Sequence, residues 1–167
     1  IGFRTFNRHH PDFFDLSILN VILGGYFGSR LMTNIREEKG YTYNIYSTLD
    51  AMQFDGCFYI GTEVGNEFVG DTRTQIYLEM DRLREELVDE DELEMMRNYI
   101  LGNYLTMIDG PFNVAELLRL LVTENLPFTE LQDSVDLTLA VTPESIQAMA
   151  QKYLIPEKMS EVIVGKA

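Results

Sequence analysis

Leu23 to Ser47 reads LGGYFGSRLMTNIREEKGYTYNIYS, and this stretch decides the fold. It divides into the glycine-rich end of an apolar helix, a short helix from about Ser29 to Lys39, and a strand that starts after Gly40. The helix carries Arg36 and the first residues of the strand carry Tyr43. Because one bend separates the two elements, the sequence predicts that these two side chains can converge.

Local signals support this division. Ser29 is a suitable N-cap for the short helix, and Leu31, Met32 and Ile35 fall on one side of it at helical spacing. Gly40 suits the left-handed residue that closes such a helix. From there the pattern has a period of two, which predicts a strand over 41–50 with Tyr41, Tyr43 and Ile45 on one face.

The same stretch resembles a known family. A glycine-containing loop is followed by Ser29-Arg30-Leu31, then by Ile35-Arg36-Glu37-Glu38-Lys39-Gly40, an aromatic residue, and a tyrosine seven places after the arginine. This order is similar to the pitrilysin-type zinc metallopeptidases, which include insulin-degrading enzyme, the mitochondrial processing peptidase and the core proteins of respiratory complex III. The resemblance is to the C-terminal, non-zinc-binding half of the paired domains, and 24–47 carries its specific motif.

The resemblance implies a site divided between two domains. The catalytic half of such enzymes binds zinc through His-x-x-Glu-His, which needs two histidines four positions apart on a helix. The only histidines here are His9 and His10, so we expect no metal bound by this chain and zinc in a homologous partner half. The resemblance further implies that Arg36 binds the peptide substrate and that Tyr43 donates its hydroxyl to the developing oxyanion. The alternative reading is that Arg36 pairs with a surface carboxylate and Tyr43 packs on the sheet.

Composition limits the partners. The chain has 167 residues, 46% of them hydrophobic, which is enough for one domain with a substantial core over 1–167. Its net charge of −14 argues against nucleic acid or an anionic membrane as a partner, and no apolar run is long enough to insert into a membrane. The strand-like start without an initiator Met suggests a fragment of a longer chain, or one half of a two-domain clamshell.

The remaining elements predict an α+β fold. The pattern indicates a strand over 1–6, a helix from an Asp12 cap to Leu23 that Gly24-Gly25 ends, and a strand over 57–64 that pairs with 41–50 across an Asp55-Gly56 turn. Helices should then cover 66–87, 89–107 with an Asp89 cap, a buried 111–121, 130–139 and 143–154, before a strand over 161–165. Together these elements favour an antiparallel or mixed sheet with helices packed on one face. The resemblance implies the same architecture.

Other motifs have simpler readings. His9-His10 lacks a further ligand at helical spacing and is read as a solvated turn, while Gly24-Gly25 is read as a bend rather than a phosphate loop. Cys57 is the single cysteine and has no histidine near it in the sequence pattern.

Two classes of function remain. The first is the non-metal half of a zinc metalloendopeptidase, and the second is a structural or scaffold module of the same family without proteolytic activity. Whether the protein is part of an enzyme is therefore open, and the isolated chain is expected to be inactive. The expected partners are a homologous zinc-bearing half, a peptide substrate and a second copy of the fragment, and the expected setting is the bacterial periplasm or cytoplasm, with the compartment left open.

Overall fold

A three-stranded antiparallel sheet organises the first part of the protein. In the computed structural model, which describes residues 1–165, the strands are β1 (Gly2–Thr5), β2 (Ile45–Ala51) and β3 (Gly56–Thr62). Their order is β1-β3-β2, so β3 pairs with both neighbours. The predicted hairpin and the predicted α+β class are therefore confirmed, and the sheet is antiparallel rather than mixed.

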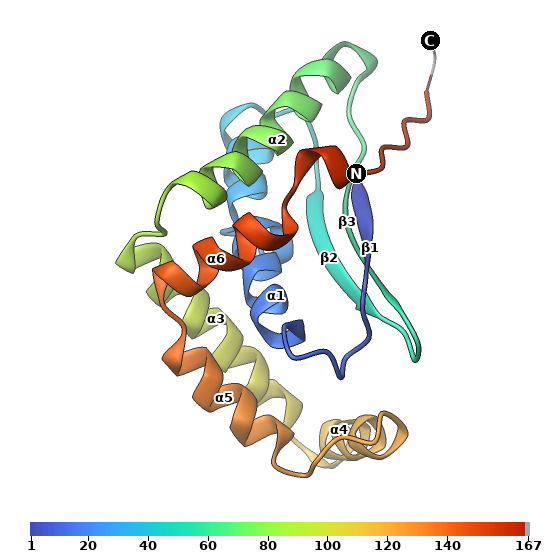
Figure 1. The fold of residues 1–167 in the computed structure, drawn as a ribbon, viewed down its shortest axis with the longest axis vertical. Coiled ribbons are helices and arrows are strands. Elements are labelled where there is room, and N and C mark those ends of the chain that lie inside the picture. The colour runs from blue at the N-terminus through green and yellow to red at the C-terminus, as the bar shows by residue number, and fades with distance from the viewer. Residues whose placement is uncertain (166–167) are drawn as a thin grey trace. The chain divides into compact units, whose positions relative to one another are not determined.

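Helices cover one face of this sheet (Figure 1). β2 packs against the first helix and against two π-helical segments, in which backbone bonds span five residues instead of four. The segments around the sheet are α1 (Phe13–Asn20), η1 (Val21–Gly25), η2 (Met32–Glu38), η3 (Asn66–Phe68), α2 (Val69–Glu85), α6 (Pro143–Tyr153) and η4 (Pro156–Lys158). The core between helices and sheet includes Leu16, Leu23, Ile35, Phe58 and Met80, each fully buried.

The described chain separates into two compact units. The first contains residues 1–87 and the chain from Glu144 onward, and the second contains Val88–Pro143. The second unit consists of α3 (Glu90–Met107), α4 (Pro111–Thr123) and α5 (Glu130–Ala140). The Asp89 carboxylate caps α3 by accepting a hydrogen bond from the Glu92 amide at 2.8 Å, as predicted.

The prediction of a buried helix over 111–121 is wrong about burial. In α4 only Leu121 is buried, while Phe112 is 88% exposed and Val122 is 68% exposed. The apolar residues of this helix are spread over several faces, and within the second unit the helix packs mainly on α3. Apolar composition predicted burial, but the number of neighbours decides it.

Two predicted caps are also wrong. The Ser29 hydroxyl is buried and has no hydrogen-bond partner among the described residues, so it does not cap the helix that carries Arg36. The Asp12 carboxylate instead accepts hydrogen bonds from Lys152 and Tyr153 of α6. These bonds, led by the one from Lys152, hold the pKa of Asp12 below its ordinary value. A tertiary ion pair has replaced a local cap.

Gly24 and Gly40 are required by the backbone. A Cβ added to Gly24 would lie 2.6 Å from the Ser47 amide nitrogen, so the glycine lets the end of η1 approach β2 closely. Gly40 has φ +67°, and the Tyr41 amide bonds to the Ile35 carbonyl at 3.1 Å across it. The predicted left-handed closure of the helix is thus confirmed.

Two predicted strand segments are not strands. Tyr41–Asn44 forms an irregular loop, and β2 begins only at Ile45. After an isolated bridge between Gly2 and Ser160, residues 161–165 contain no strand. None of the helices within residues 1–165 is both long enough and apolar enough to cross a membrane.

Candidate functional site

Arg36 lies on the π-helical segment η2. The bond from the Lys39 amide to the Asn34 carbonyl, 3.2 Å across five residues, belongs to this wider turn. The buried amide of Asn34 donates to the Glu79 carboxylate on α2 at 2.5 Å, which joins the helix to its neighbour. Arg36 is half-buried, and the central carbon of its guanidinium lies 4.6 Å from the centre of the Phe27 ring. A surface carboxylate, the partner in the alternative reading of Arg36, is not among its described contacts.

The loop after Gly40 is fixed first through Tyr41. Its hydroxyl donates to the Asp71 carboxylate at 2.9 Å, and its ring stacks on Phe68 with centroids 4.4 Å apart. Lys39 lies 3.9 Å from the same carboxylate. The hydrogen bond is the main cause that raises the pKa of Tyr41 and lowers the pKa of Asp71. This tyrosine therefore attaches the loop to the start of α2.

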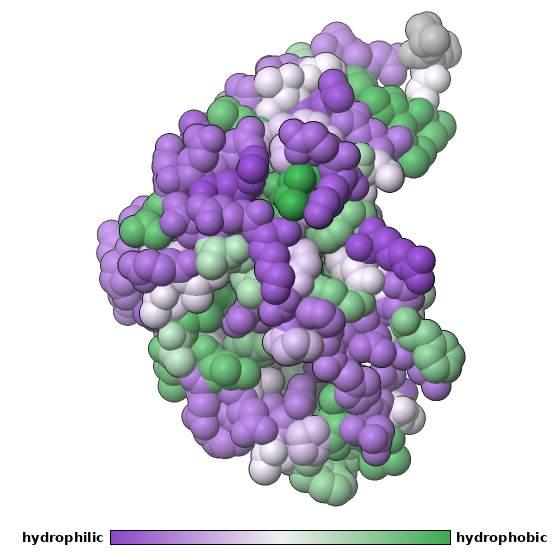
Figure 2. Space-filling model, in the orientation of Figure 1, coloured by the Kyte–Doolittle hydropathy of each residue, from purple (hydrophilic) through white to green (hydrophobic). Residues whose placement is uncertain are grey.

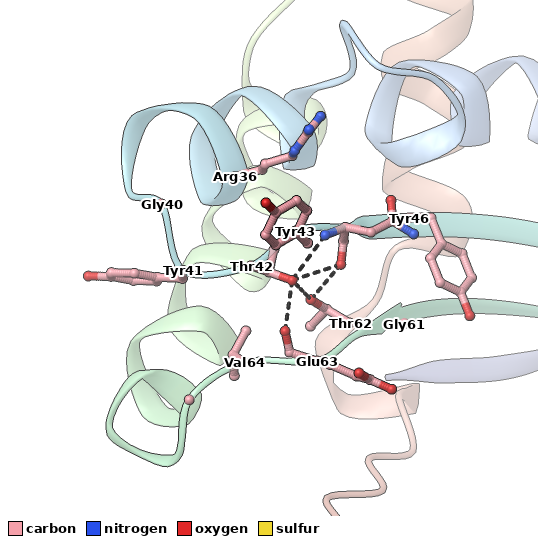
Figure 3. A pocket seen from close by; sticks show the side chains of 12 residues that line it. Arg36, Gly40, Tyr41, Thr42, Tyr43, Tyr46, Gly61, Thr62, Glu63 and Val64 are labelled. Carbon is pink, nitrogen blue, oxygen red and sulfur yellow. Dashed lines mark hydrogen bonds between the residues drawn. The ribbon is translucent and has the colours of Figure 1, made fainter.

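Thr42 attaches the loop to a second element, the end of β3. Its hydroxyl can donate to the Glu63 carbonyl at 2.7 Å or to the Asn44 carbonyl at 2.9 Å. The same oxygen accepts from the Asn44 amide and from the Thr62 hydroxyl, each at 3.2 Å (Figure 3). The loop is thereby attached to the end of β3 without forming a ladder.

Tyr43 directly follows these two attachments, and on its other side the Asn44 carbonyl accepts a hydrogen bond from the Thr62 hydroxyl at 3.0 Å. Its side chain is 93% exposed, whereas Tyr41 and Thr42 on its N-terminal side are half-buried. A pocket of about 1100 Å³ opens at this point, and Arg36, Tyr43, Tyr46 and Glu63 are among its lining residues. Figure 3 shows Arg36 on the helix and Tyr43 on the loop that follows it, at the same pocket. The structure therefore brings the two sequence-predicted site residues to one pocket.

The prediction that Tyr43 shares a strand face with Ile45 is wrong. Ile45 is fully buried, but Tyr43 precedes the strand and projects into solvent. The same exposure excludes the alternative reading, in which Tyr43 packs on the sheet. An exposed phenol beside a guanidinium offers two hydrogen-bond donors to an acceptor-rich ligand such as a peptide carbonyl or carboxylate.

Sequence reasoning missed the residues that hold the loop. Thr42 followed two residues later by Asn44 is a local signal for side chain–backbone hydrogen bonding, which competes with strand formation. That signal was available in the sequence. The contact between Tyr41 and Asp71 spans thirty positions, and no local pattern identifies it.

The described residues do not fit a zinc site. Among residues 1–165, no group of three or more His, Cys, Asp and Glu side chains is placed to hold a metal ion. His10 accepts a hydrogen bond from the Asp12 amide at 3.1 Å and stacks on Phe6, which places it in the predicted turn. No step of the chemistry is therefore assigned to a metal held by this chain.

The fold and the site define an α+β domain with an open pocket that Arg36 and Tyr43 both line. A family model described as peptidase M16 inactive domain matches residues 1–100, more than half of the chain, and the chain belongs to this family. The resemblance stated from the sequence is thereby confirmed.

Individual relatives agree with this assignment. The chain is 27% identical over 110 residues to a Bacillus subtilis protein named uncharacterized zinc protease YmxG, covering 66% of this chain and 27% of that protein. A peptidase M16 inactive domain from Pseudomonas fluorescens has 26% identity and a TM-score of 0.82, covering 94% of this chain and 39% of the other. A protease from Helicobacter pylori shares the fold, with a TM-score of 0.84 and 18% identity. The match covers 94% of this chain and 38% of that protease. The chain spans between a quarter and two-fifths of the length of these relatives.

Proposed function

We propose that this domain is the non-metal half of a zinc metalloendopeptidase. It completes a substrate cleft against a homologous zinc-bearing half, on the same polypeptide or on a separate subunit, and supplies Arg36 and Tyr43 to peptide-bond hydrolysis there. The observation that carries the proposal is the exposure of Tyr43, which is 93% on a loop that Tyr41 and Thr42 attach before it and the Asn44 carbonyl attaches after it. An aromatic side chain held in solvent in this way has no packing role in the domain.

The two donors have different tasks. The Tyr43 hydroxyl donates to the oxygen that becomes negative when water attacks the scissile carbonyl, and a donor placed before the reaction avoids reorganisation during it. The Arg36 guanidinium binds a carbonyl or carboxylate of the peptide with its fork of N–H groups. Its contact with the exposed Phe27 ring keeps it beside the pocket when no peptide is bound.

Tyr43→Phe tests the proposal in the assembled two-half enzyme. The substitution removes one donor and keeps the ring, so turnover should fall by roughly 10²- to 10³-fold, equivalent to about 3 to 4 kcal/mol. Tyr104→Phe, in the second unit, is the matched control and should leave turnover unchanged. Steady-state kinetics on a fluorogenic peptide, with the melting temperature of each variant, measures both.

Arg36→Ala separates binding from chemistry. Because Arg36 would bind the peptide in the ground state and more tightly in the transition state, KM should rise as well as turnover fall. Arg119→Ala, which removes a guanidinium paired with Glu116 on α4, is the control for loss of a positive charge. Unchanged kinetics in both Tyr43→Phe and Arg36→Ala would favour the scaffold function, in which the domain supports the assembly without taking part in catalysis.

A further inference from the structure

A row of polar side chains follows one side of α2. Asp71, Gln75 and Glu79 recur at intervals of four residues, so they lie on the same side of this helix. Figure 2 shows mostly hydrophilic side chains over α2 on the visible surface, as expected of an outer helix. The row differs from such a surface, because Glu79 is only 3% exposed and Asp71 and Gln75 are half-buried. A buried carboxylate needs bonded partners, and the row finds them in the segment that carries the candidate site.

One end of the row binds η2. The side-chain amide of Asn34 donates to the Gln75 side-chain carbonyl at 3.2 Å and to the Glu79 carboxylate at 2.5 Å. Asn34 is 8% exposed, so both hydrogens of this amide are used inside the domain. Glu79 also accepts from Arg82 at 2.8 Å. Asn34 thus bridges two positions one turn apart on α2, and Arg36 follows it by two residues.

The other end of the row binds the loop after Gly40. The Tyr41 hydroxyl donates to the Asp71 carboxylate at 2.9 Å, and Tyr43 follows Tyr41 by two residues. Gln75 joins the two ends, because its amide donates to Asp71 at 3.3 Å while its carbonyl accepts from Asn34. A continuous chain of hydrogen bonds therefore connects the residue before each site residue's neighbour to one helix.

The direction of each bond identifies Gln75 as the joining residue. An ionised carboxylate only accepts hydrogen bonds, so Asp71 and Glu79 both require donors. The Gln75 side chain offers its N–H groups to Asp71 and its carbonyl to Asn34 at the same time. Glutamate at this position would lack the donor for Asp71, and methionine would lack both groups.

We propose that this polar row sets the separation between Arg36 and Tyr43, with Gln75 as the positioning residue that joins its two ends. The proposal rests on the function proposed above. Because an α-helix rises by ~1.5 Å per residue, Asp71 and Glu79 stay ~12 Å apart along a rigid element. The segment that carries Arg36 and the loop that carries Tyr43 are each bound to that element. Two donors held in this way keep the geometry that hydrolysis of a bound peptide requires.

Gln75→Met in this chain tests the positioning directly. Methionine keeps the length of the side chain and the helix propensity, and it removes both bonds. Gln132→Met is the matched control, since the Gln132 amide donates to Asp136 four residues away on α5 at 2.9 Å. In Gln75→Met the backbone order parameters of Arg36 and Tyr43, from ¹⁵N relaxation, should fall by at least ~0.1, and in the control they should not change. Unchanged order parameters at both residues in Gln75→Met would overturn the proposal.

Kinetics of the assembled two-half enzyme give a second test. Gln75→Met should lower kcat/KM by roughly tenfold, because small displacements of catalytic groups are costly, and Gln132→Met should leave it unchanged. Asn34→Ala should lower kcat/KM by a similar factor, with a rise in KM, but by less than about twofold when Arg36→Ala is already present. An equal loss in both backgrounds would show that Asn34 does not act through Arg36 and would overturn the proposal.

The two tests also separate this proposal from the function on which it rests. If Arg36→Ala and Tyr43→Phe left the kinetics unchanged, the proposed function would fail, while the order parameters would still decide whether the row fixes these residues. Melting temperatures show whether each variant folds. Gln75 is only half-buried, so Gln75→Met keeps the test decisive even if Asn34→Ala does not fold. Wild-type kcat/KM in a folded Gln75→Met enzyme, with a reduced rate in Tyr43→Phe, would overturn the role of Gln75 alone.

Discussion

Tyr41–Asn44 and Glu161–Val164 have the same strand-like pattern and the same outcome, since neither is a strand. The first segment is irregular but attached, through the bond from Tyr41 to Asp71 and the hydroxyl of Thr42. The second has no regular structure, and only its Glu161 carboxylate bonds to a neighbour among the described residues. In the first segment side chains bond to the backbone in place of a ladder, and in the second the backbone has no hydrogen-bonded partner within residues 1–165.

The two segments therefore expose hydrophobic residues in two different settings. Tyr43 is exposed on a fixed backbone, which suits a side chain that must meet a ligand in one geometry. Val162–Val164 are exposed on a backbone for which no hydrogen bond is found within residues 1–165, so this stretch depends on the bonds of the Glu161 carboxylate to α2. Breaking the attachments of each segment should therefore affect activity in the first and stability in the second.

The largest effect in this comparison should come from Thr42→Val. The substitution keeps the side-chain shape and removes the hydroxyl that links the loop to Glu63 and Asn44. Because a small displacement of a catalytic donor can cost about 10²-fold in rate, turnover of the assembled enzyme should fall by about that factor. Steady-state kinetics with a saturating peptide measures it.

The matched control for Thr42→Val is Thr48→Val, within β2. That strand keeps its ladder without the threonine hydroxyl, so turnover should stay at the wild-type level. If Thr42→Val turned over peptide at the wild-type rate while Tyr43→Phe did not, the loop would be fixed by other contacts than this hydroxyl.

A smaller effect is expected from Tyr41→Phe. The ring stack on Phe68 remains, and only the hydrogen bond to Asp71 is lost, so turnover should fall by roughly threefold to tenfold. Asp71→Asn should have a similar effect, and the double variant should lose little more than either single variant because both act through one bond. Additive losses in this cycle would show that the two residues act separately.

Much of the fold was predictable because its signals are local. The helix closure at Gly40, the hairpin turn before β3, the Asp89 cap and the proline at the start of α4 each depend on neighbours within a few residues. The arrangement of Arg36 and Tyr43 at one pocket also followed from a single bend, helped by a family resemblance.

The errors arose where distant residues decide the outcome. Asp12 forms an ion pair with Lys152 instead of a cap, and the exposure of α4 depends on how few elements pack against it. Of the two strand errors, the one at 161–165 has this origin, since a strand needs a partner that its own sequence does not specify, whereas the one at Tyr41–Asn44 had a local signal in Thr42 and Asn44. For the site, the pattern identified the displayed Tyr43 but not the contact of Tyr41 with α2 that holds it.

For the second segment, Glu161→Gln should destabilise the protein without changing catalysis. The carboxylate accepts hydrogen bonds from Arg73 and Tyr77. The neutral amide of glutamine retains only part of these interactions, so the free energy of unfolding should fall by about 1 kcal/mol at neutral pH. Urea unfolding monitored by circular dichroism measures the change. A large loss of turnover in a variant that remains folded would contradict the separation of the two segments.

The same variant has a defined pH dependence. The hydrogen bond from Arg73, followed by that from Tyr77, lowers the pKa of Glu161 below its ordinary value of 4.5. A lowered pKa in the folded state gives stability that is present above pH 4.5 and is lost as the pH falls through the lowered value. The difference in stability between wild type and Glu161→Gln should therefore shrink in acid below that range.

The smallest effect is the titration of Tyr77. Burial, followed by the hydrogen bond to Glu161, raises the pKa of Tyr77 from 10.0 to about 12. A raised pKa means that its contribution to stability is complete below pH 10.0 and is lost as the pH rises through about 12. The absorbance difference between wild type and Tyr77→Phe near 295 nm, roughly where phenolate absorbs, should therefore appear only at the alkaline end of the titration.

In Glu161→Gln the pKa of Tyr77 should decrease but stay above 10.0, because burial is its larger cause and remains in place. A tyrosine that titrates near 10.0 in the wild type would show that Glu161 does not hold this segment against α2.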